Sequence, residues 1–257
     1  MSALEIRRDG AVATVTLSRP ERRNALDPAL LQELTAAFTG LTDEDDVRAV
    51  VLRGAGPAFC AGADLDWMAA SRELSWEENV ADAQRMAAAF EAIDACPKAV
   101  VVRVHGPAVG GGAGLVACAD VAVAAEGTTF AFSEVRLGLL PATISPYVLR
   151  AIGPSATRAL FTTGRRFDAD EARRLGLVHD VASEDRLDDT VAEVVAALLE
   201  AGPAALLACK QLVRDATSAW TLDDLPERIA RARTGAEGRE GVAAFLERRS
   251  PSWSVDC

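Results

Sequence analysis

The sequence predicts an α/β fold in which most strands pair in parallel. The first half of the chain alternates short apolar runs with amphipathic segments, in the order strand, helix, strand, helix, strand, helix, strand. After about residue 145 the pattern is helical throughout. No strong linker separates these parts, so we expect a core over residues 1–195 and a helical extension over residues 196–257. An extension with apolar faces often docks onto neighbouring subunits, which predicts an oligomer.

Local signals at the ends of segments define the elements. Alternating apolar and polar side chains around Asp9-Gly10 indicate a β-hairpin. Asp27 and Ser75 are expected to cap two helices, and Pro97 ends the second. The expected elements of the first half are strands 4–8 and 11–18, helix 28–38, strand 47–54, loop 55–70, helix 76–95, strand 99–104, helix 112–118 and strand 120–125. The expected later helices are 145–152, 155–163, 168–174, 187–200, 203–218, 222–234 and 238–248.

The composition limits the classes of function. The chain has 257 residues with a net charge of −11, so a general nucleic-acid surface is not expected, because phosphates need a basic face. The N-terminus has no apolar signal core, and no run reaches membrane-spanning length. Five cysteines without CxxC spacing indicate reduced thiols, and two histidines without a ligand cluster indicate no metal site. We therefore expect a cytoplasmic protein without nucleic-acid, membrane or metal partners.

A glycine-rich stretch, Gly106–Gly114, follows the apolar strand expected at 99–104. Gly110, Gly111 and Gly112 have no Cβ, so a ligand can approach the backbone there. A helix is expected to begin at the same point, and its free N–H groups and dipole would face that ligand. The pattern therefore predicts a site where backbone N–H groups hold an anion.

Three other interpretations of the glycine run compete with an oxyanion hole. A dinucleotide-binding fingerprint fits only loosely and would lie unusually late in the chain, and a P-loop would need Gly-Lys-Ser/Thr, which is absent. The glycines could instead serve only helix–strand packing. A second small-residue loop, Pro57–Trp67, favours an oxyanion hole, because it can present the N–H of Ala63 opposite that of Gly111. Two donors on one carbonyl oxygen would stabilise an enolate.

Glu134 is the candidate acid/base group. It lies within an otherwise apolar stretch that includes Phe130, Phe132, Val135 and Leu137. Partial burial there would raise the pKa of its carboxyl group toward the range useful for proton transfer.

Several motifs together resemble the enoyl-CoA hydratase/isomerase (crotonase) superfamily. They occur in order along nearly the whole chain: Arg19-Pro20 with Asn24-Ala25-Leu26, Phe59–Leu65, Gly110–Gly112, Ser133–Gly138, Leu160–Gly164 with Gly176-Leu177-Val178, and Phe245–Arg249. The resemblance implies a ββα-spiral core that binds coenzyme A, with C-terminal helices that support a homotrimer or a dimer of trimers. It also implies an acyl-CoA thioester as substrate, with no cofactor beyond the coenzyme A that the substrate carries.

The resemblance assigns roles to individual residues. The N–H groups of Ala63 and Gly111 would hold the thioester oxygen, with Glu134 as the acid/base. The residues expected to bind coenzyme A or substrate are Arg22, Ala25, Leu26, Ala61, Asp64, Leu65, Gly110, Phe245 and Arg248. The last two would approach the ligand from the C-terminal helix of the same subunit or of a neighbouring one. The arginines could instead be solvated surface charges, and Asp66 stands where some relatives carry a basic residue.

Gly114 stands where well-studied hydratases of the superfamily carry a second glutamate. Hydration by Glu134 alone would leave the water to be positioned by Thr143, Ser145 or Tyr147. The stretch from Glu134 to Val148 resembles hydratases of branched enoyl-CoA thioesters, such as methylglutaconyl-CoA in leucine breakdown. A Δ3,Δ2-enoyl-CoA isomerase that uses one glutamate is the alternative, and an acyl-CoA-binding protein without turnover is a hypothesis of another class. Arg136 could pair with a substrate carboxylate or with a structural acid.

Overall fold

The computed structural model describes residues 2–216, 229 and 231–254, and a six-stranded sheet is its centre. The strand order is β1-β2-β3-β4-β6-β9; β1 and β2 are antiparallel and the remaining neighbours are parallel. The bounds are β1 Leu4–Asp9, β2 Val12–Leu17, β3 Ala49–Gly54, β4 Ala99–Val104, β6 Val121–Ala125 and β9 Asp180–Ala182. β3, β4 and β6 are almost wholly buried, as expected of parallel strands covered on both faces. The predicted α/β class with mainly parallel pairing is confirmed.

A second sheet of three short strands carries the loops of interest. β5 Pro107–Val109 pairs in parallel with β7 Thr129–Ala131, which pairs antiparallel with β8 Arg166–Asp168. The expectation that everything after residue 145 is helical is therefore wrong at β8 and β9. Strands of three residues are too short to show a period of two, which is why the sequence pattern did not reveal them.

The helices agree closely with those expected from the capping signals. Asp27 accepts a hydrogen bond from the Leu30 N–H at 2.8 Å, and Ser75 forms a capping box with Glu78. The helical segments are η1 Pro20–Arg22, α1 Pro28–Gly40, η2 Leu41–Asp43, α2 Leu65–Ser71, α3 Trp76–Asp94, α4 Gly111–Ala117, η3 Glu134–Leu137, α5 Ser145–Thr163, α6 Ala169–Leu175, α7 Leu187–Glu200, α8 Pro203–Ala216 and α10 Ala236–Glu247.

Three of the expected segments need separate comment. The stretch expected to be a loop over 55–70 contains α2, a short helix that Asp64 caps. The two helices expected over 145–152 and 155–163 are confirmed: they share the label α5 but are separated at Gly153, whose non-helical φ of 72° and ψ of 166° favour glycine. The helix expected over 222–234 lies largely outside the described residues.

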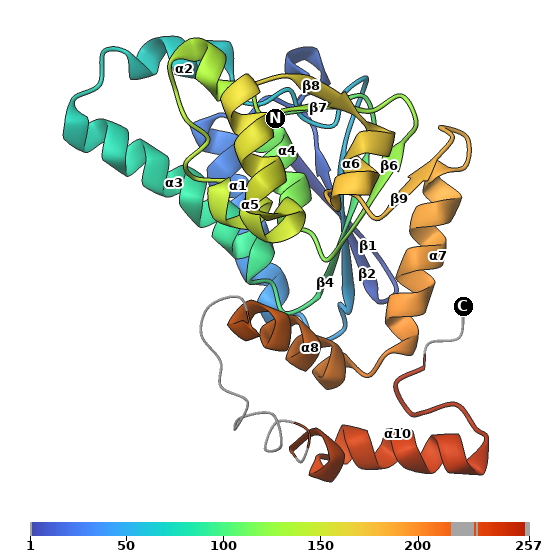
Figure 1. Cartoon of the computed structure of the whole chain (residues 1–257). Coiled ribbons are helices and arrows are strands. Elements are labelled where there is room, and N and C mark those ends of the chain that lie inside the picture. Colours follow the sequence, from blue (N-terminus) through green and yellow to red (C-terminus); the bar gives the residue numbers. More distant parts are fainter. Residues whose placement is uncertain (1, 217–228, 230, 255–257) are drawn as a thin grey trace.

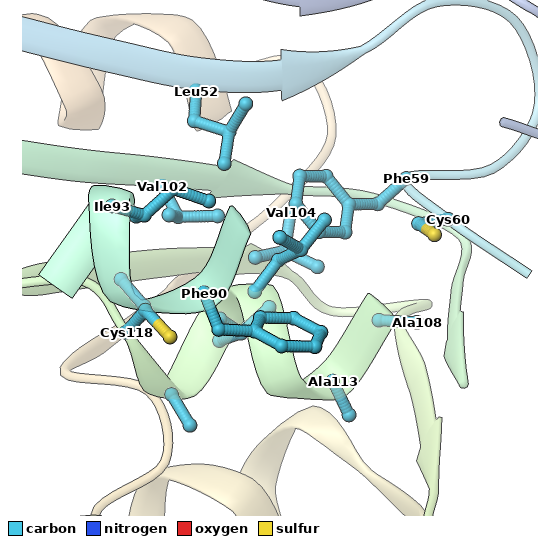
Figure 2. Close-up of a cluster of buried hydrophobic side chains, with 14 of the residues drawn as sticks. Leu52, Phe59, Cys60, Phe90, Ile93, Val102, Val104, Ala108, Ala113 and Cys118 are labelled. Carbon is cyan, nitrogen blue, oxygen red and sulfur yellow. The ribbon is translucent and has the colours of Figure 1, made fainter. Parts of the chain in front are cut away.

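Helices cover both faces of the six-stranded sheet (Figure 1). α7 packs on one face through Leu187, Val191 and Val195, and α1, α3, α4 and α5 cover the other. Figure 2 shows the second interface, where strand residues such as Val102 and Val104 face Phe90 and Ile93 of α3. The domain division expected between residues 195 and 196 falls inside α7 and stays a prediction.

α10 lies beyond α8, apart from the two sheets (Figure 1). Glu237 of α10 accepts hydrogen bonds from the N–H groups of Ala204 and Ala205 at the start of α8. Arg48 donates to the carbonyl oxygens of Ala201 and Trp253 and so ties this region to the base of the sheet. Among the described residues, no single helix is long and apolar enough to cross a membrane, and α7 and α8 meet the length and composition test only as a pair bent by 104°.

Candidate active site

Two loops that are far apart in sequence meet at the carboxyl ends of β3 and β4. The N–H of Val109 donates to the carbonyl oxygen of Cys60 at 3.0 Å, and the N–H of Cys60 donates to that of Pro107 at 3.1 Å. A Cβ atom at position 112 would lie 2.4 Å from the Cys60 carbonyl oxygen, so only glycine allows this approach. The contact brings the loop of Ala63 against the glycine run.

Leu26 fixes the position of Ala63. Its N–H donates to the Gly62 carbonyl oxygen at 2.7 Å, and its own carbonyl oxygen accepts from the Asp64 N–H at 2.8 Å. Residues 26 and 63 therefore pair as a short parallel bridge. The Leu26 side chain is fully buried, and its Cδ1 lies 2.7 Å from where a Cβ on Gly111 would be. One residue thus contacts both predicted oxyanion donors.

The N–H groups of Ala63 and Gly111 have no acceptor among the described residues. Gly110 turns the chain with φ 53° and ψ −119°, and its own N–H is bound to the Ala131 carbonyl oxygen at 2.8 Å. Gly111 then begins α4, so its N–H is one of the free donors at the helix N-terminus. Both residues are half-buried, and two such free N–H donors are what an oxyanion hole requires.

Glu134 lies beside the same turn. Its Oε1 is 3.1 Å from where a Cβ on Gly110 would be, which places the carboxyl group next to the start of α4. Its Oε2 is buried and has no hydrogen-bond partner. Burial disfavours the ionised form and raises the pKa of the Glu134 carboxyl above its ordinary value of 4.5. A buried carboxylate oxygen without a partner is ready to exchange a proton with a ligand.

Gly114, one turn into α4, is closed off by an aliphatic side chain. A Cβ at this position would lie 2.2 Å from Cγ2 of Ile144 and 3.3 Å from Cε1 of Phe90. Ile144 immediately precedes α5 and is 1% exposed. A side chain at position 114 therefore has no room while Ile144 is present. No local pattern indicates this contact, because the two residues are far apart in the chain.

The segment expected to lie along coenzyme A is held by ion pairs. Arg19 binds Asp64 at 3.1 Å and the carbonyl oxygen of Ala25 at 2.6 Å. Burial alone would raise the pKa of Asp64, but hydrogen bonds from the Asp66 N–H and from Arg19 outweigh it and lower that pKa. Asp64 thus caps α2, and its expected place at the ligand stays a prediction, while Arg22 pairs with Asp66 at 2.9 Å on the surface.

The remaining residues of this segment contribute backbone or exposed apolar groups. The N–H of Ala61 donates to the Arg23 carbonyl oxygen at 3.0 Å, and the Leu65 side chain is 76% exposed. Asn24 is buried and donates to the carbonyl oxygens of Ala55 and Ala58, both at 2.8 Å. The structural roles of Arg19 and Asn24 were not predicted, although both belong to a motif visible in the sequence.

Comparisons with known proteins agree with this geometry. The sequence model of the family described as enoyl-CoA hydratase/isomerase matches residues 7–256. The chain belongs to this family. "Enoyl-CoA hydratase ACTT6" of Alternaria alternata is 36% identical over 259 residues, which cover 98% of this chain and 85% of that relative.

Solved structures of similar proteins have the same fold. A crystal structure of an enoyl-CoA hydratase from Shewanella pealeana is 38% identical with a TM-score of 0.93, covering 98% of this chain and 96% of that one. The structure of AtuE from Pseudomonas aeruginosa is 39% identical with a TM-score of 0.94, covering 98% and 100%. The expected crotonase-like α/β core is confirmed, and the chain is an enzyme of the hydratase/isomerase family.

Two residues expected at the family's coenzyme A site are not brought to it within one chain. Phe245 is 83% exposed on α10, and Arg248 ends that helix with a φ of 55°. α10 lies apart from the sheets that carry Ala63 and Gly111 (Figure 1). Contact with a ligand would therefore require a neighbouring subunit.

The three candidates for positioning water differ in their surroundings. The Thr143 hydroxyl lies 3.0 Å from Sδ of Met86, and the Ser145 hydroxyl donates to the Ala142 carbonyl oxygen at 2.8 Å. The Tyr147 hydroxyl donates to Glu91 at 3.2 Å, close to the C-terminal end of α4. That is the opposite end of α4 from Gly110 and Glu134, so the expectation that Tyr147 positions water is not supported.

In the part of the chain that the structure describes, metal-ligating groups, reactive thiols and the two cavities beside α8 add no functional group to this site. Among the described residues, no group of three or more His, Cys, Asp or Glu side chains could hold a metal ion. Burial raises the pKa of the Cys60 thiol to about 12, so it is an unreactive core thiol despite its place in the motif. Two cavities of about 440 Å³ lie between α8 and the core, both bordered by Asp94, Lys210 and Arg214, and neither contains Glu134.

Proposed function

We propose that the enzyme adds water across the 2,3 double bond of an enoyl-CoA thioester. The N–H groups of Ala63 and Gly111 hold the thioester oxygen and stabilise the enolate that forms there. The Glu134 carboxylate takes a proton from water as the water oxygen bonds to carbon 3. The same carboxyl group then returns a proton to carbon 2, so one H and one OH are added and Glu134 is restored.

The observation that carries this proposal is the buried Oε2 of Glu134, which has no partner in the chain. The Glu134 carboxyl group lies next to Gly110. Gly110 immediately precedes Gly111, whose N–H is a free donor. The raised pKa of Glu134 suits a group that must both accept and donate a proton near neutral pH. Relatives named as enoyl-CoA hydratases support the same reaction.

A branched, methylglutaconyl-like acyl group is part of the proposal. The sequence between Glu134 and Val148 supports it through its resemblance to hydratases of such thioesters. Arg136, two residues beyond Glu134, is exposed and makes no ion pair among the described residues, so its guanidinium is free to meet a substrate carboxylate.

A Δ3,Δ2-enoyl-CoA isomerase is the second candidate, and the contact between Gly114 and Ile144 favours it. That contact leaves Glu134 as the one carboxylate beside the start of α4 among the described residues. A single carboxylate can remove a proton from carbon 2 of a 3-enoyl-CoA and return it at carbon 4. No water is consumed in that reaction.

Labelled water separates the candidates. The purified enzyme is incubated with crotonyl-, methylglutaconyl- and 3-enoyl-CoA in H₂¹⁸O, and the products are examined by mass spectrometry. Incorporation of ¹⁸O supports hydration, and conversion of the 3-enoyl thioester without ¹⁸O supports isomerisation. Glu134→Gln should lose most of either activity while it still binds acyl-CoA. No turnover of any substrate would favour a binding protein without catalysis and overturn both proposals.

We further propose a homotrimer or a dimer of trimers in the cytoplasm. Exposed apolar side chains on α10, namely Val242, Phe245 and Leu246, support an interface there. Cys60, Cys96, Cys118 and Cys209 form no disulfide, which suits a reducing compartment. Sedimentation of the wild type and of Phe245→Glu tests the assembly, and a monomeric wild type at micromolar concentration would contradict it.

A further inference from the structure

One face of α4 is lined by apolar side chains from three different parts of the chain. Gly111 and Gly114 lie three residues apart on this helix and so share a face. A Cβ at either position would meet the Phe90 ring, at 3.6 Å from Cζ for Gly111 and at 3.3 Å from Cε1 for Gly114. Leu26 closes the Gly111 end of the face, and Ile144 closes the Gly114 end.

Ile144 fills the space that a side chain at position 114 would need. Both its Cγ2 and its Cβ would lie too close to a Cβ there, at 2.2 and 2.9 Å. The Cβ is fixed to the backbone, so rotation of the side chain cannot relieve the contact. The backbone of Ile144 is itself held, because its carbonyl oxygen accepts the Val148 N–H at the start of α5.

We propose that Ile144 keeps this reaction dependent on one carboxylate, because it fills the space that a side chain at position 114 would need. This inference rests on the proposed function, in which Glu134 transfers the proton. With Ile144 in place, the α4 face beyond the free donors is lined by apolar side chains, and a charged or hydrogen-bonding group placed there would be buried without partners. Replacing Gly114 alone therefore cannot supply a second acid or base, whereas removing Ile144 as well makes room for one.

The packing part of the proposal is tested by a double-mutant cycle on stability. Gly114 has an ordinary helical backbone, so alanine there is disfavoured only by its contacts. Gly114→Ala should lower Tm in the wild type and raise it in the Ile144→Gly background, where both blocking atoms are gone. A change of sign supports the pairing of the two residues. Equal shifts of Tm in the two backgrounds would overturn it, whether or not the enzyme is active.

The functional part is tested by comparing a variant that carries a second carboxylate at position 114 with a variant that carries the uncharged glutamine there. Gly114→Glu/Ile144→Gly should fold and show one more ionisation in the pH profile of kcat/KM than Gly114→Gln/Ile144→Gly, because two nearby carboxyl groups titrate as a coupled pair. Gly114→Glu alone should lower Tm by more than 5 °C. The proposal is overturned if the single variant is as stable as the wild type, or if the folded Glu and Gln double variants have identical profiles. Failure of the proposed function shows differently, as full activity of Glu134→Gln.

Discussion

Arg19 and Asp64 form an ion pair directly beside Ala63, the first of the two proposed oxyanion donors. The guanidinium Nη2 lies 3.1 Å from Oδ2 of a carboxylate whose side chain is almost completely buried. Asp64 also accepts the Asp66 N–H and so caps α2, and it follows Ala63 in the chain. The direction of the Ala63 N–H therefore depends on a largely buried charge pair.

Loss of this pair should destabilise the protein. Asp64→Ala removes a helix cap and leaves Arg19 without one of its two carboxylates, so we expect a loss of roughly 2–4 kcal/mol in the free energy of unfolding. Asp66→Ala breaks the exposed pair with Arg22 and should cost less than about 1 kcal/mol. Urea unfolding of both variants measures the difference, and equal losses would contradict a structural role specific to Asp64.

Close approach of the two loops makes Gly112 sensitive to substitution. A Cβ there would meet the backbone oxygen of Cys60 at 2.4 Å, which cannot move without separating the loops. Gly112→Ala should cost roughly 1–3 kcal/mol by overpacking and should lower kcat by displacing the donors. Gly127→Ala is the matched control, because nothing lies within 4 Å of its Cβ position. Full activity of Gly112→Ala would show that the donors tolerate a shift.

Burial of Glu134 predicts the pH dependence of activity. The carboxylate must be ionised to accept a proton, and burial raises its pKa above 4.5. The acid limb of kcat/KM should therefore have its midpoint above 4.5, and activity should rise with pH through that midpoint. A midpoint at or below 4.5 for a substrate that does not ionise would contradict this assignment.

The ionisation of Glu134 should also affect the free energy of unfolding, and its contribution should fall as the pH rises while activity rises. A raised pKa means that the folded protein holds the Glu134 proton more tightly than the unfolded chain does. This contribution is fully present below pH 4.5 and is lost as the pH rises through the folded pKa. Glu134→Gln cannot ionise, so its unfolding free energy should increase relative to the wild type over that range. Unfolding curves that keep a constant difference from pH 4 to 8 would refute the raised pKa.

Replacing Tyr147 tests whether its hydroxyl takes part in the reaction. Its hydroxyl binds Glu91, so Tyr147→Phe should lose roughly 0.5–1.5 kcal/mol of stability and leave kcat within about twofold. A tenfold fall in kcat with unchanged Tm would return Tyr147 to the group of water-positioning residues.

Long, strongly patterned elements of the fold could be predicted from the sequence. The helix expected at 187–200 matches α7, and the caps at Asp27 and Ser75 form as expected, because these signals act over a few residues. α2 was missed because its seven residues follow a stretch of glycine, proline and small side chains that is typical of loops. β8 and β9 depend on pairing partners far away in the chain, which local patterns do not contain.

In the candidate site, too, residues within local motifs could be predicted, whereas contacts between distant parts of the chain could not. Glu134, Ala63 and Gly111 could be proposed because their motifs reflect backbone requirements at each loop. The contact between Gly114 and Ile144 could not, because a glycine does not indicate which side chain fills its space. The turn of Tyr147 toward Glu91 likewise depends on how α5 packs against α3.

The single carboxylate beside Gly110 has a stereochemical consequence. In the proposed hydration Glu134 would reach the reacting carbons from the side of Gly110, while Ile144 fills the space beside Gly114. If the carboxylate that takes a proton from water also returns a proton to carbon 2, the hydroxyl and the proton are added to the same face of the double bond. The product should therefore be one diastereomer of syn addition when the reaction is run in D₂O.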